Sequence, residues 1–411
     1  MADSLLAVNP LEPYDALIPL ATCTHGGISS QARGRGHLVD VLASYRWGST
    51  TQQSGSDFIV KVAVIDLVAP DTREAVLSWH VGAADIRRAA PFAAGRLSIV
   101  LSGGGGARTG RQLRRDGYTG QLLVDPAVYA SSEEEGDGPP QLFEAEIDWA
   151  DLQRRAGASS LLTPGVYVPH GDIGVLEAAV EGQLAWAEAN GGASLQLALH
   201  WRWLTDDVDW VVDLFSVAGA PITILLCDGN DPLSRAGAVD GLVQLASGVP
   251  DVGLHRSDLG SLGFIAHGGA HAATGISTTL RHVVPPNTPA GGRRGDRSPS
   301  VFVPQLLAWL KGSKLSGLGA GDTEGRFGCA ESCCDGKPLS RFWDEATRVE
   351  AEKHNRITFE AVAAAFLDVE AEERESTFKA MCGEAEILAA DWSGALKRDL
   401  SHPQRAAWSN R

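Results

Sequence analysis

Residues 194–231, SLQLALHWRWLTDDVDWVVDLFSVAGAPITILLCDGND, indicate the fold class of this chain. It holds two short apolar runs, 194–203 and 222–231, and each run ends in polar residues. An amphipathic segment, 207–219, separates the two runs and has the apolar spacing of a helix. The order strand, helix, strand indicates the α/β class, in which the strands of one sheet run parallel.

The same alternation continues on both sides of this stretch. Short apolar runs that end in polar residues also stand at 121–125, 142–148, 165–172, 252–258 and 273–278. Helical stretches such as 173–190 lie between them. Many such units that close on themselves form a TIM-type (β/α)8 barrel, and we predict its core between residues 116 and 300. A doubly wound open sheet is the alternative.

The two flanks of this core have different characters. Residues 57–67, 75–81 and 96–103 have the composition of strands, so we predict a β-rich N-terminal elaboration within residues 1–115. It is either an antiparallel sheet or the opening of the barrel. The chain after residue 301 is mainly helical, and we predict a third, helical subdomain over residues 301–411.

Composition and charge narrow the class of protein. The 411 residues are 44% hydrophobic and 21% charged, which is typical of a soluble globular protein. The net charge of −16 opposes non-specific binding to nucleic acid, so any such contact needs a local basic patch. No apolar run reaches the ~18 residues of a membrane span, and residues 1–15 do not resemble a signal peptide. We therefore predict a cytoplasmic protein without a membrane partner; a protein partner or a homo-oligomer stays open.

Polar side chains follow most of the predicted strands. The carboxyl ends of barrel strands face the active site, so these side chains would line one pocket for a small molecule or a base. The predicted substrate-binding residues are Tyr129, His200, Arg202, His255, Arg256 and Arg281. Asp125 follows an apolar strand and is a candidate general acid or base, or else a turn residue. Asp228 and Asp258 stand at two other strand ends.

The loop at 285–300, PPNTPAGGRRGDRSPS, carries the densest basic cluster of the chain. Its arginines are Arg293, Arg294 and Arg297. The loop is either a flexible solvated connection or a contact for the phosphate backbone of a nucleic acid.

Three of the six cysteines fall within GCAESCCDG, residues 328–336. Cys329, Cys333 and Cys334 precede a predicted helix, and His354 follows within it. Three thiolates and one imidazole complete the closed tetrahedral shell of a structural Zn²⁺ site. The alternative is three reduced thiols in a surface loop.

A late barrel strand, a Cys-rich loop and the pair His354-Asn355 at the start of a long helix resemble the tRNA-guanine transglycosylase family. That family exchanges guanine for a 7-deazaguanine base on a TIM barrel with a Cys3His zinc subdomain. The resemblance implies that LLVDPAVYA, 122–130, ends in a catalytic Asp at Asp125. The family's cysteines are spaced Cys-x-Cys-x2-Cys, whereas here the spacing is Cys-x3-Cys-Cys.

The resemblance fails at the family's nucleophile. The stretch GISTTLRHVVPP, 275–286, places Leu280 where the family has its nucleophilic Asp and Ser277 where it has another Asp. A covalent glycosyl–enzyme step needs an oxygen nucleophile, which Leu280 does not supply.

Three functions are consistent with these patterns. The first is a diverged glycosyltransferase that exchanges or recognises a base in tRNA or DNA, with Asp125 as acid or base and Asp258 or Asp228 in place of the lost nucleophile. The second is a catalytically inactive, zinc-stabilised barrel that serves as a binding or accessory subunit. The third is an unrelated barrel hydrolase or lyase.

Overall fold

The computed structural model describes residues 75–82, 97–103, 105–130, 148–286, 288 and 296–411. Eight parallel strands form one curled sheet in the order β3-β2-β1-β8-β7-β6-β5-β4. Their bounds are β1 Val76–Gly82, β2 Ser98–Ser102, β3 Leu122–Asp125, β4 Val166–Val168, β5 Leu195–His200, β6 Ile222–Cys227, β7 Val252–Ser257 and β8 His271–Gly275.

This order is the cyclic order of a TIM-type barrel, opened at one place. Except for β3 and β4, each strand pairs with its neighbour in the sequence, and β1 pairs with β8 from Val76 and His271 onward. Only β3 and β4 stand at the two edges of the sheet. The predicted barrel class is confirmed, and the doubly wound alternative is wrong because the first and last strands are hydrogen-bonded.

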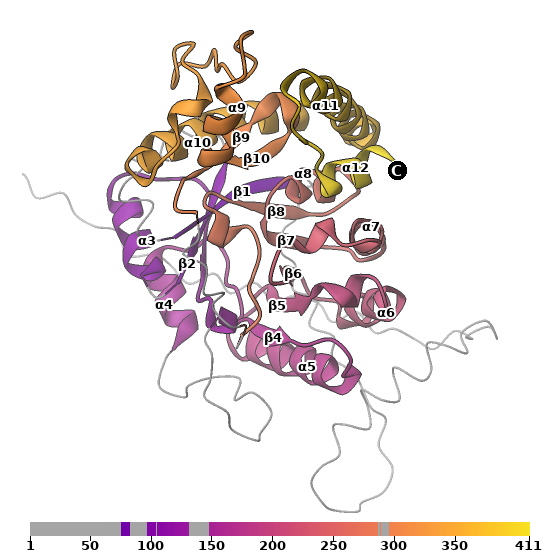
Figure 1. Ribbon diagram of the computed structural model, residues 1–411. Coiled ribbons are helices and arrows are strands. Elements are labelled where there is room, and N and C mark those ends of the chain that lie inside the picture. The colour runs from indigo at the N-terminus through magenta and orange to yellow at the C-terminus, as the bar shows by residue number, and fades with distance from the viewer. Residues whose placement is uncertain (1–74, 83–96, 104, 131–147, 287, 289–295) are drawn as a thin grey trace, which may run out of the picture. The chain divides into compact units, whose positions relative to one another are not determined.

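A helix follows each strand from β2 to β7 and covers the outside of the sheet (Figure 1). The helices are α3 Gly106–Arg115, α4 Trp149–Ala156, α5 Ile173–Ala189, α6 Val208–Ala218, α7 Ala238–Gly248 and α8 Gly260–Ala266. Short polar residues start several of them: the carboxylate of Asp172 accepts from the backbone N–H of Val175 at the beginning of α5. Strands that are covered on both faces have nearly continuous apolar sequences. In β6, for example, all six residues are buried.

Two arrangements were predicted for the N-terminal strands: an antiparallel sheet, or the opening of the barrel. Residues 75–81 and 96–103 fall in β1 and β2, which pair in parallel, with Trp79 opposite Ile99. They are the opening of the barrel, and the antiparallel sheet predicted for them is wrong. The predicted strand at 57–67 lies outside the described residues. The run at 142–148 does so as well, except for Asp148, which caps α4.

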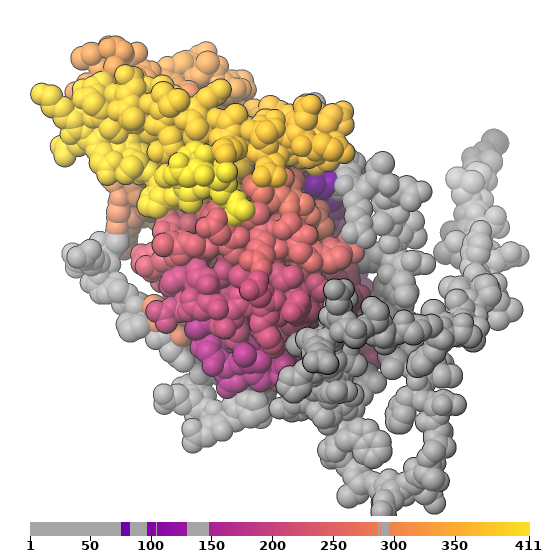
Figure 2. All heavy atoms as spheres, turned by 90° about the vertical axis from the view of Figure 1, so that its right-hand side faces the viewer, coloured from indigo at the N-terminus to yellow at the C-terminus, as the bar shows by residue number. Residues whose placement is uncertain are grey.

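A smaller C-terminal subdomain follows the last barrel strand. An antiparallel pair, β9 Ser300–Val303 and β10 Ala308–Lys311, leads into α9 Gly312–Gly319, α10 Arg348–Leu367, α11 Arg374–Leu396 and α12 Pro403–Ser409. Figure 2 shows the yellow C-terminal helices lying directly against the rose barrel segment. The amide of Gln404 on α12 donates to Asp258 at 2.9 Å, and the Trp79 indole on β1 donates to Glu360 on α10 at 2.8 Å. In the described part of the chain, no helix is long and apolar enough to cross a membrane.

Candidate metal centre and barrel mouth

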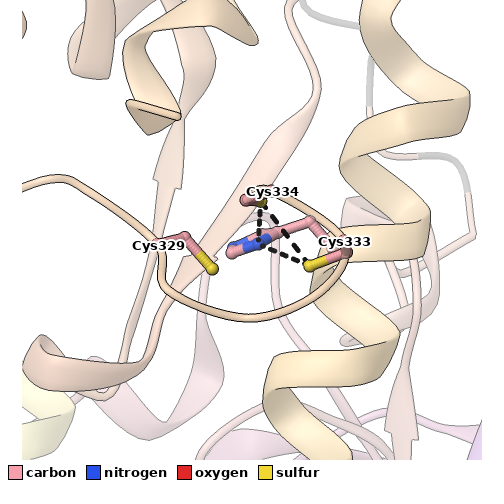
Figure 3. A group of neighbouring side chains, drawn as sticks. Cys329, Cys333 and Cys334 are labelled. Carbon is pink, nitrogen blue, oxygen red and sulfur yellow. Dashed lines mark hydrogen bonds between the residues drawn. The ribbon is translucent and has the colours of Figure 1, made fainter. Parts of the chain in front are cut away.

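The three clustered cysteines and His354 come together as the sequence predicts. Their ligand atoms all lie within 4.8 Å of one another. The Sγ atoms of Cys333 and Cys334 are 3.5 Å apart, and Nδ1 of His354 is 3.2 Å from Cys334 Sγ and 3.7 Å from Cys333 Sγ. Tetrahedral bonds of zinc to sulfur and nitrogen place neighbouring ligand atoms about 3.5–3.8 Å apart. The cluster therefore fits a Cys3His metal site, and its sulfur atoms turn inward in Figure 3.

A tight backbone turn lets two adjacent cysteines face the same centre. The N–H of Cys334 donates to the carbonyl oxygen of Glu331 at 2.8 Å, and the N–H of Gly336 donates to that of Cys329 at 2.9 Å. Asp335 and Gly336 both have positive φ angles, 51° and 72°. This left-handed pair reverses the chain just after Cys334. The reversal accounts for the unusual Cys-x3-Cys-Cys spacing.

The His354-Asn355 pair holds α10 against β9. Nε2 of His354 lies 2.8 Å from the carbonyl oxygen of Phe302, which leaves Nδ1 with its lone pair toward the sulfur atoms. The side chain of Asn355 accepts from the N–H of Phe302 and donates to the carbonyl oxygen of Ser300, both at 2.8 Å. The metal centre is therefore joined to the segment that leaves the barrel.

Asp125 lies at the carboxyl end of β3 and is completely buried. Its Oδ2 accepts from the Tyr129 hydroxyl at 2.5 Å and the Ser102 hydroxyl at 3.2 Å. Its Oδ1 accepts from the N–H of Ala127 at 2.8 Å. Nε2 of His80, on β1, is 3.3 Å from Oδ2. Burial by itself raises the pKa of Asp125, but His80, the Arg256 guanidinium and Tyr129 outweigh it, so the pKa is lowered and the carboxylate stays ionised.

Two residues of this cluster have strained backbones. Ala127 has φ 57°, in the left-handed region that L residues rarely adopt. Arg256 has φ 52° and sits in a register shift of β7 between Leu254 and Ser257. Bulges of this kind re-aim side chains next to functional sites. The shift brings the Arg256 guanidinium to 5.4 Å from the Tyr129 ring centroid and 3.5 Å from the Ser102 hydroxyl.

The barrel interior beside Asp125 contains buried polar atoms without partners. Trp79 points outward to α10, so its neighbour His80 points inward, where its ring centroid is 5.9 Å from that of His255. The unpartnered atoms among the described residues of this region are Nδ1 of His80, Nδ1 of His255, Nε of Arg256 and both amide atoms of Gln196. Burial lowers the pKa of both histidines, so both are neutral near pH 7. Buried groups of this kind are normally hydrogen-bonded, so this array is suited to a polar ligand.

The other two candidate carboxylates already have partners. Asp228 receives two hydrogen bonds from Arg235, at 2.6 and 3.0 Å. Burial alone would raise the pKa of Asp228, but the hydrogen bonds and the charge of Arg235 outweigh it, so the pKa is lowered. Asp258 accepts from Gln404 and so joins the barrel to α12. Asp231 is different: burial, followed by the charge of Asp258, raises its pKa to about 7.

The remaining predicted site residues fall in three places. His200 and Arg202 lie at the end of β5, where the guanidiniums of Arg202 and Arg235 are 5.7 and 5.5 Å from the Trp201 ring centroid. Arg281 is buried; it donates to Gly275 and Ser300, and thus joins β8 to β9. Arg297 is 85% exposed and 3.8 Å from Glu345. Arg293 and Arg294 lie outside the described residues. Leu280 is buried.

The sequence interpretation did not single out three residues that the structure brings into these sites. His80 and Gln196 face the barrel interior, and Arg341 contacts Cys334. For His80 a signal was present, because it alternates with the apolar Trp79 and Val81 in a strand. No local pattern in the sequence indicates the contact of Arg341 with Cys334.

Comparison with known proteins gives little beyond the architecture. No protein-family model matches the chain, and no curated protein matches it. Among solved structures, the 3-hexulose-6-phosphate synthase from Salmonella typhimurium is similar at 14% identity and a TM-score of 0.29, over 49% of this chain and 88% of that chain. A likeness of this size bears neither on the chemistry nor on the ligand of this chain.

Proposed function

We propose that this chain is a diverged relative of the tRNA-guanine transglycosylases that recognises a nucleobase of tRNA or DNA at the mouth of its barrel. The observation that carries the proposal is the buried group of Asp125, Tyr129, His80 and Arg256, with its unpartnered hydrogen-bonding atoms. A flat heterocycle with ring N–H and C=O groups satisfies such an array. The Cys3His cluster that follows the last barrel strand agrees with the same ancestry.

The residues best support a protein that recognises a base but does not exchange it covalently, because the residue at position 280 is a leucine. Leu280 is buried and apolar, and the carboxylates of Asp228 and Asp258 are engaged by Arg235 and Gln404. Asp125 is held ionised by its neighbours, so in this arrangement it accepts hydrogen bonds and does not release a proton. The protein then acts as a binding or accessory subunit.

Zinc is the cofactor that this proposal includes. Cys329, Cys333, Cys334 and His354 would hold it, and with four protein ligands it would have no open position for a substrate. Its contribution would be to stabilise the C-terminal subdomain.

Binding of a free base and of a nucleic acid tests the proposal in two separate steps. Calorimetry with guanine and 7-deazaguanine measures the first, and fluorescence anisotropy with tRNA and duplex DNA measures the second. We expect binding that Arg256→Gln and Asp125→Asn weaken by about tenfold or more, since each removes a charged hydrogen-bonding partner. Asp116→Asn, at an exposed site after α3, is the matched control. A folded, zinc-loaded protein that binds no base and no nucleic acid would refute the proposal.

The contact between His80 and Asp125 favours a second candidate, a barrel hydrolase or lyase. A carboxylate next to an imidazole, here at 3.3 Å, is an arrangement used for proton transfer. Turnover of a small substrate without any nucleic acid, abolished by His80→Gln, would favour this candidate. Incorporation of labelled guanine into tRNA would instead favour base exchange.

A further inference from the structure

The three thiolates of the metal centre differ in the hydrogen bonds that they receive. The guanidinium Nη2 of Arg341 donates to Cys334 Sγ at 2.9 Å. The backbone N–H of Glu331 donates to the sulfur of Cys329. The sulfur of Cys333 has contacts with the other ligands of the cluster: Cys334, Cys329 and His354. Cys334 and Cys329 thus each receive an N–H from outside the cluster, whereas these contacts of Cys333 are with the cluster itself.

The three sulfurs also differ in their access to solvent. Cys329 and Cys334 are buried, at 4% and 2% exposure, and belong to the apolar core of the C-terminal subdomain. Cys333 is only half-buried, and its neighbours Ser332 and Asp335 are exposed. The same turn that directs two adjacent cysteines to one centre therefore leaves one of them at the surface.

Both differences affect how readily each thiolate reacts with an electrophile. A hydrogen bond to a metal-bound thiolate draws electron density from its lone pairs and makes it a weaker nucleophile. Zn²⁺ with three thiolates and a neutral imidazole carries one net negative charge, and Arg341 places its positive charge on the Cys334 side. Cys333 keeps the most electron density and has the freest approach.

We propose that Cys333 is the reactive modification site of this protein, where the zinc-bound thiolate would attack a soft electrophile and the metal would be released. The electron pair of the thiolate forms a sulfur–carbon bond to an activated alkene, and the other alkene carbon takes a proton from water. The product is a neutral thioether, a poor ligand for Zn²⁺, so the site loses one anionic ligand and the ion dissociates. The inference depends on the metal centre and not on the nucleobase site.

The test uses the full-length, zinc-loaded chain and less than one equivalent of N-ethylmaleimide. Because Cys23 lies outside the described residues, it is first replaced in a Cys23→Ser background. Peptide mass spectrometry locates the label, and a colorimetric chelator follows the zinc. We expect Cys333 to be labelled about tenfold faster than Cys329 or Cys334, with one zinc released per label. The buried Cys227 and Cys382 are internal controls that stay unlabelled.

The variant Arg341→Gln isolates the effect of the hydrogen bond. We expect the labelling of Cys334 to rise toward that of Cys333 while the rate at Cys333 stays the same. Arg398→Gln, at an exposed position on the same subdomain, should change neither rate. Equal labelling of the three thiols in the parent protein, labelling of Cys334 first, or a folded protein that holds no zinc would overturn the inference, and none of these results requires the variant to fold.

Discussion

Nε2 of His354 lies 2.8 Å from the carbonyl oxygen of Phe302, so the imidazole that completes the metal cluster is oriented by the first strand after the barrel. With this nitrogen protonated, Nδ1 faces the sulfurs of Cys333 and Cys334. Asn355 holds the same strand through two further hydrogen bonds. The Cys3His cluster and the docking of α10 on β9 are therefore linked, because one contact, from His354 to Phe302, belongs to both.

Removal of the Asn355 amide should weaken zinc binding although Asn355 is not a ligand. Asn355→Ala leaves Phe302 free to shift, and His354 shifts with it, so we expect a zinc affinity about 10–100-fold lower. Competition with a chromophoric chelator measures the affinity. Asn410→Ala, at an exposed position near the end of α12, is the control and should leave the affinity unchanged. An unchanged affinity in Asn355→Ala would show that α10 is held in place by other contacts.

Loss of a ligand should remove the metal altogether. Elemental analysis of the purified chain should give about one zinc, and Cys333→Ser and His354→Ala should each abolish it. The C-terminal subdomain should then become sensitive to protease, since a structural zinc contributes directly to folding. Substitution of the buried Cys382, which lies outside the cluster, should leave the zinc content unchanged. A protein that retains its zinc in either ligand variant would contradict the assignment.

The hydroxyl of Tyr129 should stabilise the fold through the buried carboxylate of Asp125. Tyr129→Phe removes a hydrogen bond to a charged group, so we expect the free energy of unfolding to fall by about 1.5–3 kcal/mol. Urea denaturation measures it, and Tyr167→Phe is the control because Tyr167 packs against the same apolar cluster. The pKa of Asp125 is lowered on folding, so its contribution is present above about pH 4 and fades in stronger acid. Equal losses in the two variants would contradict this role.

Because of Asp231, the protein should lose stability as the pH rises from mildly acidic to neutral. Its pKa is about 7 in the folded state, against about 4 in an unfolded chain, because of burial and the charge of Asp258. Between these values the folded state holds a proton that the unfolded state releases, so the free energy of unfolding falls as pH rises from about 4 to 7. Asp231→Asn should flatten this slope, whereas the exposed Asp213→Asn should not. The same slope in parent and Asp231→Asn would show that other groups cause it.

Two glycine-to-alanine substitutions test how closely the chain is packed, one inside the barrel and one on a helix of the C-terminal subdomain. A Cβ at Gly253 on β7 would lie 1.9 Å from Nε2 of His271, so Gly253→Ala must displace the half-buried imidazole, and we expect the free energy of unfolding to fall by about 1–3 kcal/mol. A Cβ at Gly383 on α11 meets no described atom within 4 Å. Gly383→Ala should therefore stabilise the helix by about 0.5–1 kcal/mol. Thermal unfolding measures both, and a neutral Gly253→Ala would contradict the close packing around His271.

The class of the fold and the four residues of the Cys3His cluster were predictable from the sequence alone. Apolar runs alternating with amphipathic segments identify parallel strands and outer helices, because both patterns are local in the chain. Cys329, Cys333, Cys334 and His354 are identifiable because few other arrangements account for three thiols within six residues.

Only the tertiary structure decided where the barrel opens and which side chains meet. Strand patterns do not encode pairing, so the contact of β1 with β8 and the free edges of β3 and β4 were not predictable from them. His80 meets Asp125 because two strands bring distant residues to one end of the sheet, and Arg341 meets Cys334 because a turn folds back on itself. The exposed Arg202 and the buried Arg281 look alike in the sequence. Burial and hydrogen bonding depend on neighbours in space, and these neighbours exist only once the chain has folded.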